Sequence, residues 1–311
     1  MNWRKRVEHP DVASAVLTLT EARPDVEVPA LPGRRVLITG ATGFIGGHVA
    51  ERLIRGRSKV RLVVRRPDRA EAFHAAGAEI RRGDLTNSST LRGCCDDIEI
   101  VLHCGAWLGT PYDRAVAYAV NVGGTTALAE EALRAGVRRF VHLSSVAVYG
   151  PVRSGIVTEK SPPWKGVHLY GDSKIDGETA LAAVASRGLP TVVTRPGIVY
   201  GPRSRGATIQ LVRLINRGWP AMVAGGYGYS RPIFVENLVD ALVLCSVKPV
   251  TGKAFTLIDA NVRWRVYLAH YGRMVGKTPR SVPFPVAWLL AVAFEARGHI
   301  TRRPPRIWRK A

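Results

Sequence analysis

Apolar runs and helical apolar spacings alternate along this chain. The run from Val36 to Ile38 predicts a buried parallel strand. After a group of glycines, Val49, Leu53 and Ile54 have the spacing of one face of a helix. Because such strands and helices keep alternating, the pattern predicts an α/β fold. The 311 residues suffice for a complete doubly wound domain and a smaller lobe.

Three glycines, Gly40, Gly43 and Gly46, lie between the predicted strand and helix. Glycine permits the tight turn and the close approach of a pyrophosphate, while a helix N-terminus supplies free N–H groups and a positive dipole end. The alternative is a glycine-rich turn without a ligand, which this strand and helix context disfavours. The expected contacts of the dinucleotide are Gly40, Thr42, Gly43, Phe44, Ile45 and Gly46.

The second predicted strand, residues 60–64, indicates which dinucleotide is bound. An acidic residue at its end would hold the ribose 2′-hydroxyl of NAD. Val64 stands at that position here, and Arg65 and Arg66 follow. A guanidinium grips a 2′-phosphate with two hydrogen bonds, so we expect NADP rather than NAD. The alternative is that both arginines are solvated loop charges.

Tyr170 and Lys174 are the strongest candidates for catalysis. They are four residues apart, so on a helix they project from one face. A fixed positive charge beside a phenol favours the phenolate and lowers its pKa from about 10. The pair therefore predicts a group that exchanges protons at neutral pH.

Several further motifs follow the glycine loop in order. They are Gly83-Asp84-Leu85-Thr86, Val101 to Ala106, Asn121-Val122-Gly123-Gly124-Thr125, Phe140 to Gly150, and Arg195 to Pro202. With them, residues 34–295 resemble an extended short-chain dehydrogenase/reductase of the NAD-dependent epimerase/dehydratase family. The stretch from Gly252 to Tyr267 is most similar to the 3β-hydroxysteroid dehydrogenase and dihydroflavonol reductase branch.

The resemblance implies a Rossmann fold, that is, a doubly wound parallel sheet, with a smaller C-terminal substrate lobe. The expected divisions are an N-terminal extension at 1–33, a dinucleotide-binding domain at 34–196, and a lobe at 197–311 from which some segments return to the sheet. The resemblance further implies cofactor contacts at Asp84, Leu85, Cys104, Gly105, Ala106, Asn121, Tyr170, Lys174, Pro196, Gly197 and Ile198. It also implies a homodimer formed by helices near residues 114–136 and 167–187.

Catalytic roles are likewise implied by the resemblance. Ser145 is the expected catalytic hydroxyl, with Ser144 as the alternative. Tyr170 would exchange the proton of the substrate oxygen during hydride transfer, while Lys174 would hold the nicotinamide ribose and keep the pKa of Tyr170 low. The family's dehydratases carry an acid where this chain has Val146 and Ala147, so dehydration is disfavoured.

Among the remaining activities, we expect a ketone/secondary alcohol oxidoreductase acting on a bulky, largely apolar small molecule. The alternatives are a nucleotide-sugar epimerase with tightly bound NAD and a non-catalytic NADP-binding regulator. Ser145 and four aromatic residues are the candidate substrate contacts, although the aromatics equally suit simple packing. These aromatics are Trp107, Tyr149, Trp164 and Tyr200.

Charge and cysteine content exclude other classes of function. The net charge of +21 is spread without a nucleic-acid-binding motif, so nucleic acid is not an expected partner. The four cysteines lack the spacing of metal ligands, so no metal site is expected. Free thiols and the lack of a signal peptide favour a cytoplasmic protein.

An apolar run at residues 286–294 is followed by several arginines. Residues 286–311 therefore suit a helix lying on an anionic membrane surface. The alternative is a core helix of the lobe with a charged tail.

Overall fold

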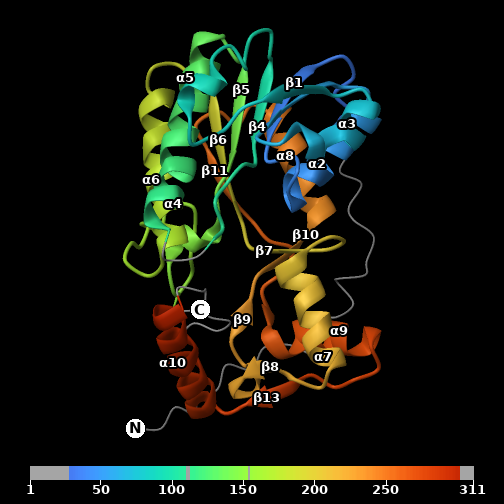
Figure 1. The fold of residues 1–311 in the computed structure, drawn as a ribbon, viewed down its shortest axis with the longest axis vertical. Coiled ribbons are helices and arrows are strands. Elements are labelled where there is room, and N and C mark those ends of the chain that lie inside the picture. Colours follow the sequence, from blue (N-terminus) through green and yellow to red (C-terminus); the bar gives the residue numbers. More distant parts are fainter. Residues whose placement is uncertain (1–27, 110–112, 153–154, 302–311) are drawn as a thin grey trace.

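A parallel sheet forms the core of the computed structural model, which describes residues 28–109, 113–152 and 155–301. In this part of the chain, seven parallel strands follow the order β11-β6-β5-β4-β1-β2-β3 (Figure 1). The strands are β1 (Arg35–Thr39), β2 (Lys59–Val64), β3 (Glu79–Arg82), β4 (Ile100–His103), β5 (Arg139–Leu143), β6 (Thr191–Pro196) and β11 (Ala254–Leu257). The predicted doubly wound sheet is confirmed.

Helices cover both faces of this sheet. On one face lie α4, α5 and α6, and on the other lie α2 and α8, with α3 at the β3 end (Figure 1). The helices are α2 (Phe44–Arg55), α3 (Glu71–Ala75), α4 (Arg114–Tyr118), α5 (Thr125–Arg134), α6 (Leu169–Ala185) and α8 (Val235–Val247). A π-helical turn at Ala119–Gly124 joins α4 to α5. Two apolar cores result, one on each side of the sheet.

The two cores follow directly from the apolar spacing of the sequence. Val49 and Leu53 of α2 are buried with Leu238 of α8 in the first core. Leu128 of α5 and Leu181 of α6 are buried in the second. The predicted helix after the glycine loop is thus confirmed, with its apolar face on the sheet.

The smaller lobe lies below the carboxyl ends of the strands (Figure 1). Its elements are β7 (Ile198–Tyr200), α7 (Leu211–Asn216), β8 (Pro220–Val223), β9 (Tyr229–Ser230), β10 (Pro232–Phe234), β12 (Val262–Arg263), α9 (Trp264–Met274), β13 (Arg280–Val282) and α10 (Phe284–Thr301). Between them the chain returns to the main domain as α8 and β11, and β11 pairs with β6. Of the expected extension, residues 1–27 lie outside the described residues, and Leu31 is buried in the first core.

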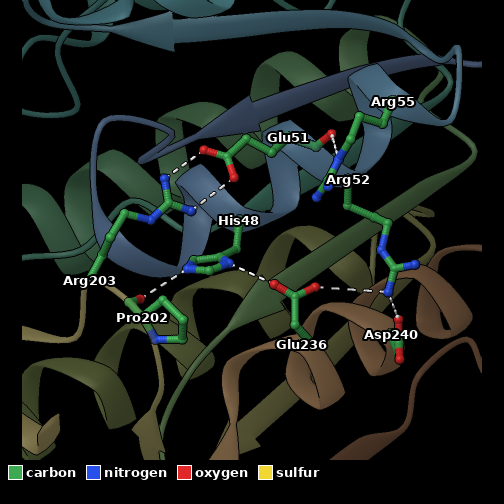
Figure 2. Close-up of polar contacts among 8 residues, drawn as sticks. All are labelled: His48, Glu51, Arg52, Arg55, Pro202, Arg203, Glu236 and Asp240. Carbon is green, nitrogen blue, oxygen red and sulfur yellow. Dashed lines mark hydrogen bonds and ion pairs between the residues drawn. The ribbon is translucent and has the colours of Figure 1, made fainter.

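Polar contacts fasten the lobe to the helix that follows the glycine loop. Figure 2 shows His48 of α2 between two acceptors, the Pro202 carbonyl at 3.1 Å from Nε2 and the Glu236 carboxylate at 2.7 Å from Nδ1. Arg203 donates twice to Glu51 of α2, at 2.6 and 3.0 Å, and holds the pKa of that carboxyl below its ordinary value. The segment leaving β7 is therefore fixed against α2.

Two buried histidines lie side by side in the middle of the sheet. The His103 ring contacts the hydroxyls of Thr39 and Thr125 at 2.7 and 3.0 Å, whereas neither ring nitrogen of His142 has a hydrogen-bond partner among the described residues. Burial lowers the pKa of His103 to about 3 and that of His142 well below 6.5, and the Lys174 charge acts in the same direction. Both rings are therefore neutral in the folded protein.

We predict that these histidines make the fold sensitive to acid. In the unfolded chain the rings bind protons near pH 6.5, but in the folded chain His103 does so only near pH 3. The free energy of unfolding should therefore fall as the pH drops through that window, by about 1.4 kcal/mol for each pKa unit of difference. His142→Leu should flatten this loss in urea unfolding at pH 7.5 and pH 5. The exposed His74→Leu should keep the wild-type dependence; equal losses in all three proteins would contradict the assignment.

Candidate active site

A cavity of about 690 Å³ lies at the carboxyl ends of the central strands, where the strand order reverses between β1 and β4. In doubly wound sheets, ligands bind at the point where the strand order reverses. The volume of this cavity is within the range of small-molecule binding sites. The predicted residues that line it are Gly40, Thr42, Gly43, Phe44, Ile45, Gly46, Arg65, Asp84, Leu85, Cys104, Gly105, Ala106, Trp107, Ser145, Tyr170, Pro196 and Gly197.

The glycine loop fits a dinucleotide because its backbone leaves no space for side chains. Gly40 has a φ of +74°, and a Cβ added at Gly46 would lie 2.4 Å from the Gly40 carbonyl oxygen. The N–H of Gly43 donates to that carbonyl at 2.9 Å, which closes the turn. Helix α2 starts at Phe44 and has no acidic side chain in its first turn. Its free N–H groups therefore suit a pyrophosphate.

The arginines after β2 separate into two groups. Arg65 lines the cavity, and Arg69 lines it as well, brought back by a 3₁₀ turn at Pro67–Ala70. Arg66 instead pairs with Asp68 at 2.9 Å on the surface, and its predicted contact with the cofactor is not seen at the cavity wall. Sequence analysis missed Arg69. The signal was Pro67, a residue typical of the first position of a helical turn, and Arg69 lies within that turn.

Tyr170 enters the cavity from the second position of α6. His168 caps this helix, since its Nδ1 accepts from the Gly171 N–H at 2.8 Å. Burial raises the pKa of Tyr170 to about 12, while a hydrogen bond with Ser145 acts in the opposite direction. The expected lowering of this pKa is therefore wrong for this structure. At neutral pH the phenol is protonated and serves as a donor.

Lys174 lies behind the cavity wall. Its Nζ donates to the Leu143 carbonyl at 2.6 Å, and Leu143 itself lines the cavity. Burial lowers the pKa of Lys174 to about 8, and the Glu178 carboxylate opposes that shift. Burial, rather than the charge of Lys174, decides the pKa of Tyr170.

A buried ion pair supports this face of α6. Glu178 accepts two hydrogen bonds from Arg195 of β6, at 3.0 and 2.6 Å, and a further one from the Ser144 hydroxyl. Both members of the ion pair are largely buried. The Ser144 hydroxyl is hydrogen-bonded to Glu178, whereas the Ser145 hydroxyl is hydrogen-bonded to Tyr170. Sequence analysis missed Glu178, although it follows Lys174 by one helical turn.

Three of the four predicted substrate aromatics lie outside the cavity lining. Tyr149 is buried, and its hydroxyl contacts Arg195 and Thr256, both at 2.9 Å. Trp164 is half exposed and packs beside Gly150. Tyr200 packs in the lobe core against Phe234 and Tyr267. Trp107 alone of the four lines the cavity.

Asn121 and Ile198 also lie outside the lining. The buried Asn121 side chain accepts from the Trp107 N–H at 2.7 Å and donates to its carbonyl at 3.2 Å. It therefore positions the loop that carries Trp107. Ile198 pairs with Pro232 as β7 meets β10. For both residues, the predicted direct contact with the cofactor is not seen at the cavity wall.

The rest of the lining is mainly apolar. Leu108, Val116, Val120, Leu143 and Val199 contribute to it. Among the described residues, no group of His, Cys, Asp and Glu side chains could hold a metal ion. Among the polar side chains of the lining, Tyr170 and Ser145 are the hydroxyls that were predicted to act on a substrate oxygen.

Comparisons with known proteins agree with this geometry. The model of the NAD dependent epimerase/dehydratase family matches residues 36–259. Sterol demethylase protein B of Methylococcus capsulatus is 34% identical over 53% of this chain and 52% of its own length. UDP-glucose 4-epimerase of Vibrio cholerae is 29% identical over 73% of this chain and 70% of its own length. This chain thus spans only about half of the sterol demethylase.

A solved structure gives the same result for the fold. UDP-glucose 4-epimerase of Thermus thermophilus, in complex with NAD, superimposes with a TM-score of 0.69 at 25% identity. The match covers 80% of this chain and 86% of that one. Because the family model spans most of the chain, and because the glycine loop and Tyr170 meet at one cavity, this protein belongs to the NAD-dependent epimerase/dehydratase family.

Proposed function

We propose that this protein is an NADP-dependent oxidoreductase that exchanges a hydride between the nicotinamide and a ketone or secondary alcohol. One observation carries the proposal: Tyr170 and Ser145 line the same cavity as the glycine loop. A bound nicotinamide cofactor supplies the hydride acceptor or donor there. The protein supplies the groups that bind and protonate the substrate oxygen.

Tyr170 and Ser145 act on that oxygen in different ways. Ser145 donates a hydrogen bond, which tightens as negative charge develops on the oxygen. Tyr170 donates its proton from Oη to the same oxygen, and the raised pKa keeps this proton in place at neutral pH. Both groups stabilise the negative charge that develops on this oxygen during hydride transfer, whichever way the reaction runs.

The lining supports an apolar substrate. Trp107, Leu108 and Val116 offer contact surface but no charge that would pair with a nucleotide diphosphate. The similarity to a protein named for sterol demethylation is in line with this class of substrate. We therefore propose a sterol-like or isoprenoid-like ketone.

The two cavity arginines support NADP. Val64 ends β2 at the position where a family member that binds NAD would place a carboxylate, and Arg65 and Arg69 follow it and line the cavity. A carboxylate at this point would repel a 2′-phosphate, whereas two guanidiniums could bind it from two sides.

An NAD-dependent nucleotide-sugar epimerase is the second candidate. The similarity to UDP-glucose 4-epimerases in sequence and in fold favours it. A dehydratase is not proposed, because Val146 and Ala147 offer no titratable group beside Ser145.

Tyr170→Phe tests the catalytic proposal. Without the phenolic proton, kcat for NADPH oxidation by sterol and isoprenoid ketones should fall at least about 100-fold. Tyr118→Phe is the matched control, because Tyr118 bonds to Asp176 outside the cavity lining and should leave kcat near the wild-type value. Turnover by Tyr170→Phe at the wild-type rate would remove Tyr170 from the mechanism.

Arg69→Ala tests the choice of cofactor. Loss of a charged hydrogen bond to the 2′-phosphate should weaken NADP binding by roughly 10- to 100-fold and leave NAD binding unchanged, as measured by calorimetry. Arg66→Ala is the control and should change neither affinity, since Arg66 pairs with Asp68. Tighter binding of NAD than of NADP by the wild type, or NAD retained through purification, would favour the epimerase.

A further inference from the structure

Helix α10 is apolar on every side. From Phe284 to Phe294 it contains no charged residue, and the first charge is at Glu295. A helix without a polar face is normally enclosed by a protein core or by lipid. The position of α10 in the fold therefore decides which of these applies.

The fold leaves α10 largely uncovered. Phe284 and Leu289 are 63% and 61% exposed, and Val286, Trp288 and Leu290 are exposed too. Ala291 alone of the described residues in this helix is buried. Among the described elements none packs extensively along α10, which stands at the edge of the lobe in Figure 1. The lobe therefore does not use α10 as a core helix.

The apolar run of this helix, Phe284 to Phe294, is too short to cross a bilayer. Eleven uncharged residues rise about 16 Å, roughly half the thickness of the hydrocarbon core. In the described part of the chain, no helix has the length and apolarity needed for a membrane span. An apolar run of this length is typical of a core helix or of an interfacial segment, and the exposure of α10 favours the interfacial segment.

The C-terminal part of the sequence, which contains α10, is strongly basic. From residue 260 to residue 311 the sequence holds eleven lysines and arginines and one acidic residue. In the lobe, Arg265 stacks over Tyr227 at 5.1 Å and Arg263 over Tyr229 at 5.0 Å, and both tyrosines are exposed. Aromatic rings beside cations are typical of the boundary between lipid headgroups and acyl chains.

We propose that α10 docks this protein onto an anionic lipid bilayer, with Phe284, Trp288 and Leu289 in the headgroup region and the lobe arginines against acidic headgroups. A second copy of the chain is a poorer occupant, because two lobes of the same strong positive charge repel one another. The inference depends only on this surface and stands independently of the reaction catalysed.

Flotation of the full-length protein with vesicles tests the proposal. We expect it to float with phosphatidylcholine vesicles containing 30% phosphatidylserine, and far less with pure phosphatidylcholine. Raising the salt from 0.1 M to 1 M should weaken binding, because the attraction between surface charges is screened. The double variant Leu289→Glu/Leu290→Glu should reduce vesicle partitioning by roughly tenfold or more, since two apolar contacts are lost.

Ile156→Glu is the matched control, because Ile156 is an exposed apolar residue of the main domain and its replacement should not change flotation. Dinucleotide binding and the melting temperature show whether each variant is folded. Failure of the wild type to float with either vesicle would overturn the proposal, as would flotation unchanged in the double variant. Oligomers that dissociate in the double variant, without vesicle binding by the wild type, would assign α10 to a second copy instead.

Discussion

The ion pair between Glu178 and Arg195 joins strand β6 to the face of α6 that carries Tyr170 and Lys174. Tyr170, Lys174 and Glu178 follow one another at intervals of four residues, so their side chains leave the helix on one side. Only Glu178 reaches across to β6, and Pro196, the residue after Arg195, lines the cavity. Breaking a largely buried pair leaves an uncompensated charge, so this contact fixes the helix in one position. The place of Tyr170 in the cavity depends on it.

Burial shifts the pKa values of two of the three titratable groups on this face, Tyr170 and Lys174. It raises the pKa of Tyr170 to about 12 and lowers that of Lys174 to about 8, so each group is pushed towards its neutral form. The Glu178 carboxylate opposes this for Lys174, and a hydrogen bond with Ser145 opposes it for Tyr170. The cavity therefore has a protonated phenol in its lining and a lysine close behind its wall.

Sequence patterns predicted the features that depend on local geometry. The glycine loop is recognisable because only glycine fits where a Cβ at Gly46 would meet the Gly40 carbonyl. The pairing of Tyr170 with Lys174 follows from helical spacing, and the sheet follows from buried apolar runs. These constraints act between residues that are only a few positions apart, so the local sequence is enough to predict them.

Features that depend on distant packing were not predictable. Tyr149 resembles a pocket aromatic, yet its hydroxyl meets Arg195 and Thr256 from separate strands. Arg66 precedes the 3₁₀ turn and pairs with Asp68 on the surface, whereas Arg69 lies within the turn and lines the cavity. The sign of the Tyr170 shift depends on how deeply the whole fold buries the phenol, which spacing does not reveal.

The central claim is that Tyr170 faces the reactive ring of a dinucleotide held by the glycine loop. A crystal structure of the protein with NADP tests it most directly, through the position of nicotinamide C4 relative to the phenol. We expect the space between C4 and Tyr170 Oη to admit one carbonyl group, with the carbonyl carbon about 3–3.5 Å from C4. A nicotinamide ring turned away from Tyr170, or a dinucleotide bound outside this cavity, would contradict the account.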